Sequence, residues 1–92
     1  MKSIISNKKT CFVCSCGYDI HKHHIYYGSA NRRLSEKYGC WVYLCGKHHN
    51  LSNEGVHFNK KLDTKLKRFC QEKWEEKRTR EEFMHVFGRN YL

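Results

Sequence analysis

Two segments of the sequence decide the predicted fold, HKHHIYYG at residues 21–28 and WVYLCGKHHN at residues 41–50. Each contains a pair of adjacent histidines, and the second also contains Cys45. Upstream of both stands the segment Cys11-Phe-Val-Cys14. Together these side chains outnumber the ligands that one structural zinc ion takes. We therefore predict two metal sites, one that stabilises the fold and one that takes part in chemistry.

Length and cysteine content agree with this prediction. The 92 residues make a single domain, 1–92, whose core is marginal unless a disulfide, a metal or a partner subunit supplements it. We expect no signal peptide and no membrane span, because no apolar run is long enough for either. A reducing cytoplasm is therefore the expected compartment, and there six cysteines with CxxC spacing indicate metal binding rather than disulfides.

The chain is strongly basic, with 18 Lys and Arg against 9 Asp and Glu, a formal net charge of +9 and a pI near 9.4. Two Trp, six Tyr and five Phe residues are interleaved with the basic ones. Nucleic acid is the first partner that such a composition indicates. A soluble basic domain without such a partner is the alternative that charge alone leaves open.

Hydrophobic periodicity, caps and turn residues predict a mixed α+β chain. The expected order is strand 18–25, helix 29–38, strand 41–44, helix 45–53, helix 59–78 and helix 79–87. Gly39 and Gly88 are the expected stop signals of two helices, and Thr79 with Glu82 matches a capping box. The stripe on the long helix is predicted to form core, and it consists of Leu62, Leu66, Phe69, Cys70 and Trp74.

Spacing separates the ligands into two sets. Cys11 and Cys14 form a knuckle that can bind one zinc ion, and Cys45 and His48, at the first turn of a helix, can complete the four ligands. Cys16 can replace Cys14 by a shift of register, and the sequence leaves this open. His49 points away from that turn.

Strand and helix periodicity place the remaining histidines. On a strand, His21, His23 and Ile25 share one face, and Ile20, Lys22 and His24 share the other, so the adjacent His23 and His24 point apart. On a helix, His49 and Asn53 are four residues apart and share one face.

The order CxxC, His-His-Ile and Leu-Cys-x-x-His-His over about residues 11–57 resembles the HNH (ββα-metal) endonucleases, most closely the small zinc-containing proteins of bacteriophages. The resemblance implies two antiparallel strands and a helix around a catalytic metal, stabilised by a structural zinc. We therefore expect an HNH core at about 11–57 and a helical extension at about 59–92.

The resemblance also implies a role for each matching position. His24 corresponds to the general base, and the ligands of the catalytic metal correspond to His23, His49 and Asn53. Cys11, Cys14, Cys45 and His48 correspond to the structural zinc set. Such proteins usually carry an Asn before the second strand that braces the loop of the base. That position falls on Cys40 here, and Asn31 can serve instead.

The implied activity is metal-dependent hydrolysis of DNA phosphodiester bonds, with nicking expected from a lone site. Imidazole ligands accept Mn²⁺, Ni²⁺ or Zn²⁺ as well as Mg²⁺, and we expect Mg²⁺ or Mn²⁺ to be the physiological ion beside the structural Zn²⁺. The expected partner is double-stranded DNA, contacted by Arg32, Arg33 and Lys47, and the expected state is a monomer or weak homodimer. A phage-encoded protein would act in the cytoplasm of its bacterial host.

Two other functions compete with this one. A zinc-stabilised nucleic-acid-binding module without catalysis explains the charge and the zinc ligands but leaves His23, His24 and His49 without a role. A structural protein would need all extra histidines to be satisfied surface groups. His21 and His85 receive no catalytic role, and His57 is an auxiliary candidate ligand or phosphate contact because it follows a glycine near the site.

Overall fold

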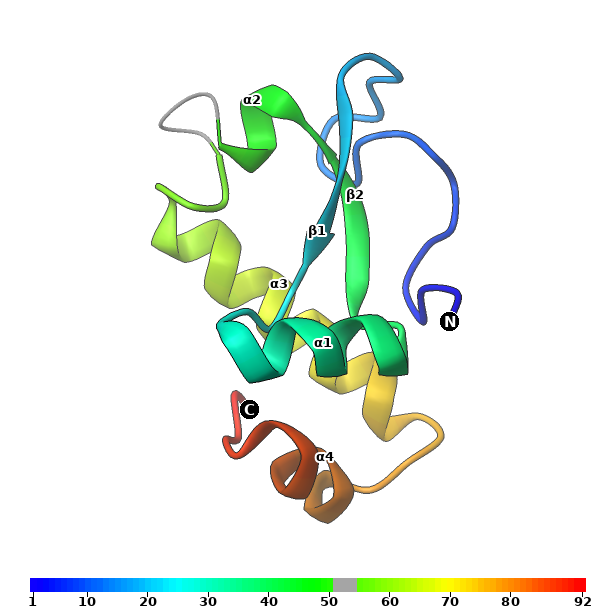
Figure 1. Cartoon of the computed structure of the whole chain (residues 1–92), viewed down its shortest axis with the longest axis vertical. Coiled ribbons are helices and arrows are strands. Elements are labelled where there is room, and N and C mark those ends of the chain that lie inside the picture. Colours follow the sequence, from blue (N-terminus) through cyan, green and yellow to red (C-terminus); the bar gives the residue numbers. More distant parts are fainter. Residues whose placement is uncertain (51–54) are drawn as a thin grey trace.

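The computed structural model describes residues 1–50 and 55–92 and has the predicted α+β class (Figure 1). Strands β1 (Ile20–His24) and β2 (Trp41–Cys45) form a two-stranded antiparallel sheet. The helices of the described ranges are α1 (Ser29–Tyr38), α2 (Gly46–His49), α3 (Lys60–Glu75) and α4 (Arg80–Phe87). Helix α1 crosses one end of the sheet and α2 lies at the opposite end. None of these helices has the length and apolar content that a bilayer crossing requires.

Strand β1 begins two residues later than the sequence predicts. Asp19 has a φ of 53°, and a residue in this left-handed region interrupts the pleated backbone. From Ile20 onward the pairing is regular, with His23 opposite Val42 and His24 opposite Trp41. The expected alternation holds, because His23 is buried while Lys22 is exposed.

Gly39 ends α1, as predicted, in the left-handed conformation that favours glycine. The N-terminal arm also passes this residue closely. The amide of Ile4 donates to the Gly39 carbonyl at 2.9 Å, and a Cβ added to Gly39 would collide with the Lys2 carbonyl oxygen. Glycine is therefore required at this position for two independent reasons.

The arm before the first cysteine is attached to β2. The Ser3 hydroxyl donates to the Trp41 carbonyl at 2.5 Å, and the Trp41 indole N–H donates to the Met1 carbonyl at 3.1 Å. These contacts hold the arm, which contains no helix or strand, next to the first residue of β2.

Helices α3 and α4 close the core. Leu66, Cys70 and Trp74 of α3 pack with Phe83 and Phe87 of α4. The predicted capping box is present, since Thr79 accepts from the Glu82 amide while the Glu82 carboxylate accepts from the Thr79 amide. The segment that follows α2 in the sequence, residues 51–54, includes the predicted end of that helix and lies outside the described residues.

The predicted apolar stripe of α3 is wrong at one position and misses another. Leu62 and Phe69 are both half-buried, but Leu62 packs against the core, whereas Phe69 packs on the exposed Phe12, with ring centroids 5.8 Å apart. Gln71 is fully buried instead, because its side chain binds Asn90 and the Tyr91 amide, each at 2.8 Å, and so holds the C-terminal tail. The spacing of apolar residues does not predict the burial of a glutamine, because burial of its polar side chain depends on hydrogen-bond partners elsewhere in the chain.

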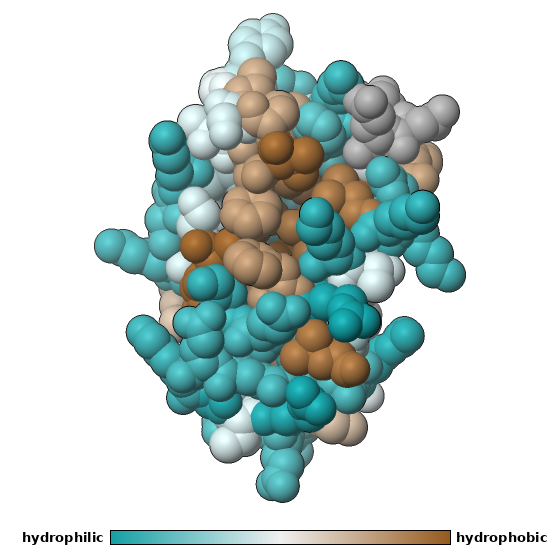
Figure 2. Space-filling view, turned by 180° about the vertical axis from the view of Figure 1, so that it is seen from behind, coloured by the Kyte–Doolittle hydropathy of each residue, from teal (hydrophilic) through white to brown (hydrophobic). Residues whose placement is uncertain are grey.

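Hydrophobic side chains gather on the face opposite to that of Figure 1 (Figure 2). A groove of about 920 Å³ is lined by Phe12 and Val13 together with one face of α3 between Lys60 and Glu72. None of its lining residues carries a predicted catalytic or metal-binding role.

Candidate metal centres

The cysteine-rich group consists of Cys11, Cys14, Cys45 and His48, whose ligand atoms all lie within 4.8 Å of one another. The first two come from a tight turn in which the Ser15 amide donates to the Cys11 carbonyl at 2.8 Å. The other two lie at the junction of β2 and α2. The Phe12 amide donates to the Tyr43 carbonyl at 2.8 Å and so attaches the turn to β2.

The spacing inside this group fits a tetrahedral zinc ion. Cys14 Sγ and Cys45 Sγ are 3.8 Å apart, and His48 Nδ1 lies 3.3 Å from Cys45 Sγ and 3.7 Å from Cys11 Sγ. Zinc–sulfur bonds of about 2.3 Å at the tetrahedral angle separate two sulfurs by roughly 3.8 Å. The four residues can therefore hold a structural metal ion such as zinc.

The environment of Cys11 favours the thiolate that a metal needs. Burial opposes ionisation, but hydrogen bonds from the backbone of Cys45, Cys14 and Val13 outweigh it and lower the pKa of Cys11 to about 6. Cys16, the alternative ligand, lies outside the group, and its sulfur accepts from the Tyr18 amide at 3.3 Å. The geometry therefore favours Cys14 over Cys16.

A second group consists of His23, His49 and His57, which come from β1, from the end of α2 and from the chain after the undescribed segment. His49 Nε2 and His57 Nε2 are 3.2 Å apart, and the His23 ring lies 5.4 Å from each of the other two, centroid to centroid. Two hydrogen bonds bring His57 here, because the amides of Val56 and His57 donate to the carbonyls of His48 and His49 at 2.8 and 3.3 Å.

His23 gives the clearest sign that this group is a site. Its side chain is buried, and its Nε2 atom has no hydrogen-bond partner among the described residues. Buried polar atoms in native proteins nearly always have a partner. A metal ion bound by the three imidazoles would supply the missing one.

The charge state of these imidazoles also suits a metal. Burial, followed by the charges of His49, His57, His24 and Lys67, lowers the pKa of His23 to about 3. Burial and the charges of His57 and His21 lower the pKa of His49 to about 4. Both rings are therefore neutral at pH 7 and present lone pairs. Three protein ligands leave a position for a further ligand, as in catalytic rather than structural sites.

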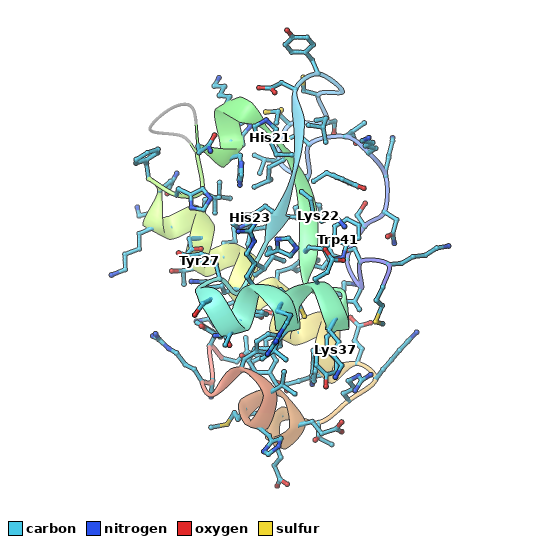
Figure 3. All side chains as sticks on the ribbon, viewed as in Figure 1. His21, Lys22, His23, Tyr27, Lys37 and Trp41 are labelled. Carbon is cyan, nitrogen blue, oxygen red and sulfur yellow. The ribbon has the colours of Figure 1, made fainter. Side chains whose placement is uncertain are left out.

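His24 belongs to neither group. It projects from the face of β1 opposite to His23, and its Nε2 lies 3.0 Å from Glu36 Oε1 of α1. The same carboxylate binds Lys22 at 3.2 Å, and the Lys22 ammonium lies 4.1 Å from the centroid of the Trp41 ring. Figure 3 shows His23 and Tyr27 on one side of the hairpin and Lys22 and Trp41 on the other.

The carboxylate of Glu36 is held ionised by this arrangement. The hydrogen bond from His24, then contacts with Lys22, lower the pKa of Glu36. Glu36 is therefore the side chain that orients the His24 ring in this structure. The sequence alone carries a weak signal for this, since Glu36 is one of several charged residues on α1.

The remaining candidate residues of the described ranges lie on helices α1 and α2. Arg32 and Arg33 are exposed on α1, Lys47 is exposed on α2, and Asn31 is half-buried on α1. Asn53 lies outside the described residues. The sequence ranked His57 below Asn53 as a ligand, because only the folding-back of the chain after α2 brings His57 to His49.

Comparison of the chain with protein-family models, with curated proteins and with solved structures finds no match. The function is therefore inferred from the site itself.

Proposed function

We propose that the protein is a metal-dependent endonuclease of the HNH (ββα-metal) class that hydrolyses phosphodiester bonds of DNA. The observation that supports this most is the division of its histidines. One group with cysteines suits a structural zinc, a second group of three imidazoles suits a catalytic ion, and His24 is free of both. A purely structural zinc domain needs only the first group.

The arrangement of elements is consistent with a ββα-metal core. An antiparallel pair, β1 and β2, is followed directly by helix α2. The cysteine-rich group joins the knuckle to the start of α2, and the histidine group joins β1 to the end of the same helix. A structural zinc would thus hold His49 in position relative to His23.

In this proposal His24 is the general base. Glu36 accepts a hydrogen bond from His24 Nε2–H, which leaves Nδ1 with the lone pair that removes a proton from the attacking water. The ionised carboxylate then stabilises the imidazolium that forms. The outer edge of β1 has no strand partner in the described sheet, and the proposal places the phosphate along that edge, between His24 on one face of the strand and the histidine group on the other. A divalent ion held by His23, His49 and His57 would polarise the phosphate and stabilise the leaving oxygen.

The charge of the chain supports a phosphate-rich substrate. The net charge is +9, and Arg32 and Arg33 on α1 and Lys47 on α2 are exposed. Contacts of this kind position a duplex on the protein without reading its sequence.

A nicking assay on supercoiled plasmid tests the proposal. The protein is loaded with one equivalent of Zn²⁺ and assayed with Mg²⁺ or Mn²⁺, with and without EDTA. We expect wild type to nick and His24→Ala to lose about 10²- to 10⁴-fold in rate, the usual value of a positioned base. His24→Ala should retain its zinc and its melting transition.

His85→Ala is the matched control, because His85 is exposed on α4 and belongs to neither metal group. It should nick like wild type. Equal nicking by His24→Ala and His85→Ala would remove His24 from its role. DNA binding without nicking in any metal would instead favour the non-catalytic zinc module.

A further inference from the structure

Asp19 and His21 are connected to the histidine group through His49. His21 Nδ1 is 3.0 Å from His49 Nδ1, and His21 Nε2 is 2.9 Å from Asp19 Oδ1. Neither residue is among the three whose ligand atoms converge. Figure 3 shows His21 next to α2, where His49 is the last residue.

The protons of this chain of contacts can be placed in one consistent way. His49 Nε2 faces His57 Nε2 at 3.2 Å, so it needs a lone pair if both nitrogens bind one ion. The proton of His49 then lies on Nδ1 and is donated to His21 Nδ1. His21 must carry its own proton on Nε2, where the Asp19 carboxylate accepts it. Each nitrogen is used once, and each contact has one donor and one acceptor.

We propose that Asp19 and His21 are positioning residues that hold the His49 ring in the Nδ1–H tautomer and turn its Nε2 toward the metal. Metal-binding histidines commonly donate their second N–H to such a partner, which fixes the ring and raises its basicity. The inference rests on the metal centre of the proposed function, but not on hydrolysis of DNA.

The backbone places Asp19 for this task. Its left-handed conformation turns the chain just before β1, and its carbonyl accepts from the Gly46 amide at 2.9 Å. Asp19 is therefore attached to the first residue of α2, the helix that carries His49. The conformation that shortens β1 thus brings the carboxylate to His21.

Titration of Mn²⁺ into protein already holding one equivalent of Zn²⁺ tests the inference. Loss of such a partner typically costs 10- to 100-fold in metal affinity. The Asp19 and His21 side chains are 41% and 33% exposed, so we expect the lower end, about 10-fold, for His21→Ala. His21→Gln should recover most of the affinity, because its amide oxygen can accept from His49 Nδ1–H. Asp19→Ala should give a smaller loss, and the control His85→Ala none.

Long-range ¹H–¹⁵N NMR of the histidine rings gives a readout that a merely structural role would not change. We expect His49 in the Nδ1–H tautomer in wild type and a mixture of tautomers in His21→Ala. An Nε2–H tautomer for His49 in wild type, or Mn²⁺ affinity equal in His21→Ala and His85→Ala, would overturn the inference. A crystal structure of the Mn²⁺-loaded protein in which His21 Nδ1 binds the ion directly would also overturn it.

The two proposals fail in different ways. If wild type binds Mn²⁺ with the expected dependence on His21 but does not nick DNA, the positioning role stands and the endonuclease proposal fails. If wild type binds no second ion, both fail.

Discussion

Glu36 reaches His24 from α1, and its carboxylate oxygen lies 3.0 Å from the imidazole Nε2. A neutral amide of the same shape keeps the acceptor but loses the charge that stabilises the protonated ring. Glu36→Gln should therefore lower nicking by about 10- to 100-fold, less than His24→Ala. The Glu36 side chain is 44% exposed, so we expect the melting temperature to change little.

Glu81→Gln is the matched control, since Glu81 is an exposed carboxylate on the first turn of α4, away from the hairpin. If Glu36→Gln nicks as fast as Glu81→Gln, His24 does not depend on its carboxylate partner.

Substitution of single residues can also show whether Cys14 or Cys16 is the zinc ligand. Cys14 Sγ lies 3.8 Å from Cys45 Sγ, whereas Cys16 binds the Tyr18 backbone outside the group. Cys14→Ser should lose zinc and its cooperative melting transition, while Cys16→Ser should keep both. Bound zinc is measured by release to a chromogenic chelator. Zinc retained by Cys14→Ser but lost by Cys16→Ser would reverse the assignment.

At the scale of the elements, the junction after α1 should be sensitive to a methyl group added at Gly39. An alanine at position 39 would have to adopt φ 73° and would press on the Lys2 carbonyl. The conformational cost alone is about 1–2 kcal/mol. We expect Gly39→Ala to lower the free energy of unfolding by at least that amount, measured by urea denaturation of the zinc-loaded protein.

Gly17→Ala provides the comparison, because a Cβ on Gly17 meets nothing within 4 Å and its φ is not in the left-handed region. It should change the free energy of unfolding little. Equal effects of the two substitutions would mean that Gly39 neither adopts the left-handed conformation nor lies against the N-terminal arm in solution.

For the whole molecule, metal binding and folding should be coupled. Structural zinc in small domains contributes about 10–16 kcal/mol of apparent binding free energy, which is comparable with the roughly 5–15 kcal/mol stability of a whole domain. We predict that a strong chelator unfolds the protein, as followed by circular dichroism, and that Zn²⁺ refolds it. His49→Ala should still fold with one equivalent of zinc, whereas Cys45→Ala should not.

A chelated protein that keeps its cooperative transition would show that the apolar core suffices without metal. The buried core residues, among them Trp74, Phe83 and Phe87, would then stabilise the fold without a metal ion.

Local signals in the sequence determined much of the local structure of this protein. The helix end at Gly39, the capping box of Thr79, the alternation of His23 and His24 and the knuckle at Cys11 depend on residues a few positions apart, and all appear in the structure. The start of β1 was missed because Asp19 adopts a backbone conformation that aspartate only sometimes takes.

Only the tertiary structure decided which side chains that are far apart in the sequence come into contact. Glu36 reaches His24 because α1 packs on β1, and His21 reaches His49 because α2 packs on β1. His57 reaches His49 because the amides of Val56 and His57 donate to carbonyls of α2. No periodicity links such positions, since the contacts depend on how separate elements pack. The sequence by itself therefore predicted two groups of candidate metal ligands, while packing brought His57 into the second group and gave His24 and His49 their hydrogen-bond partners.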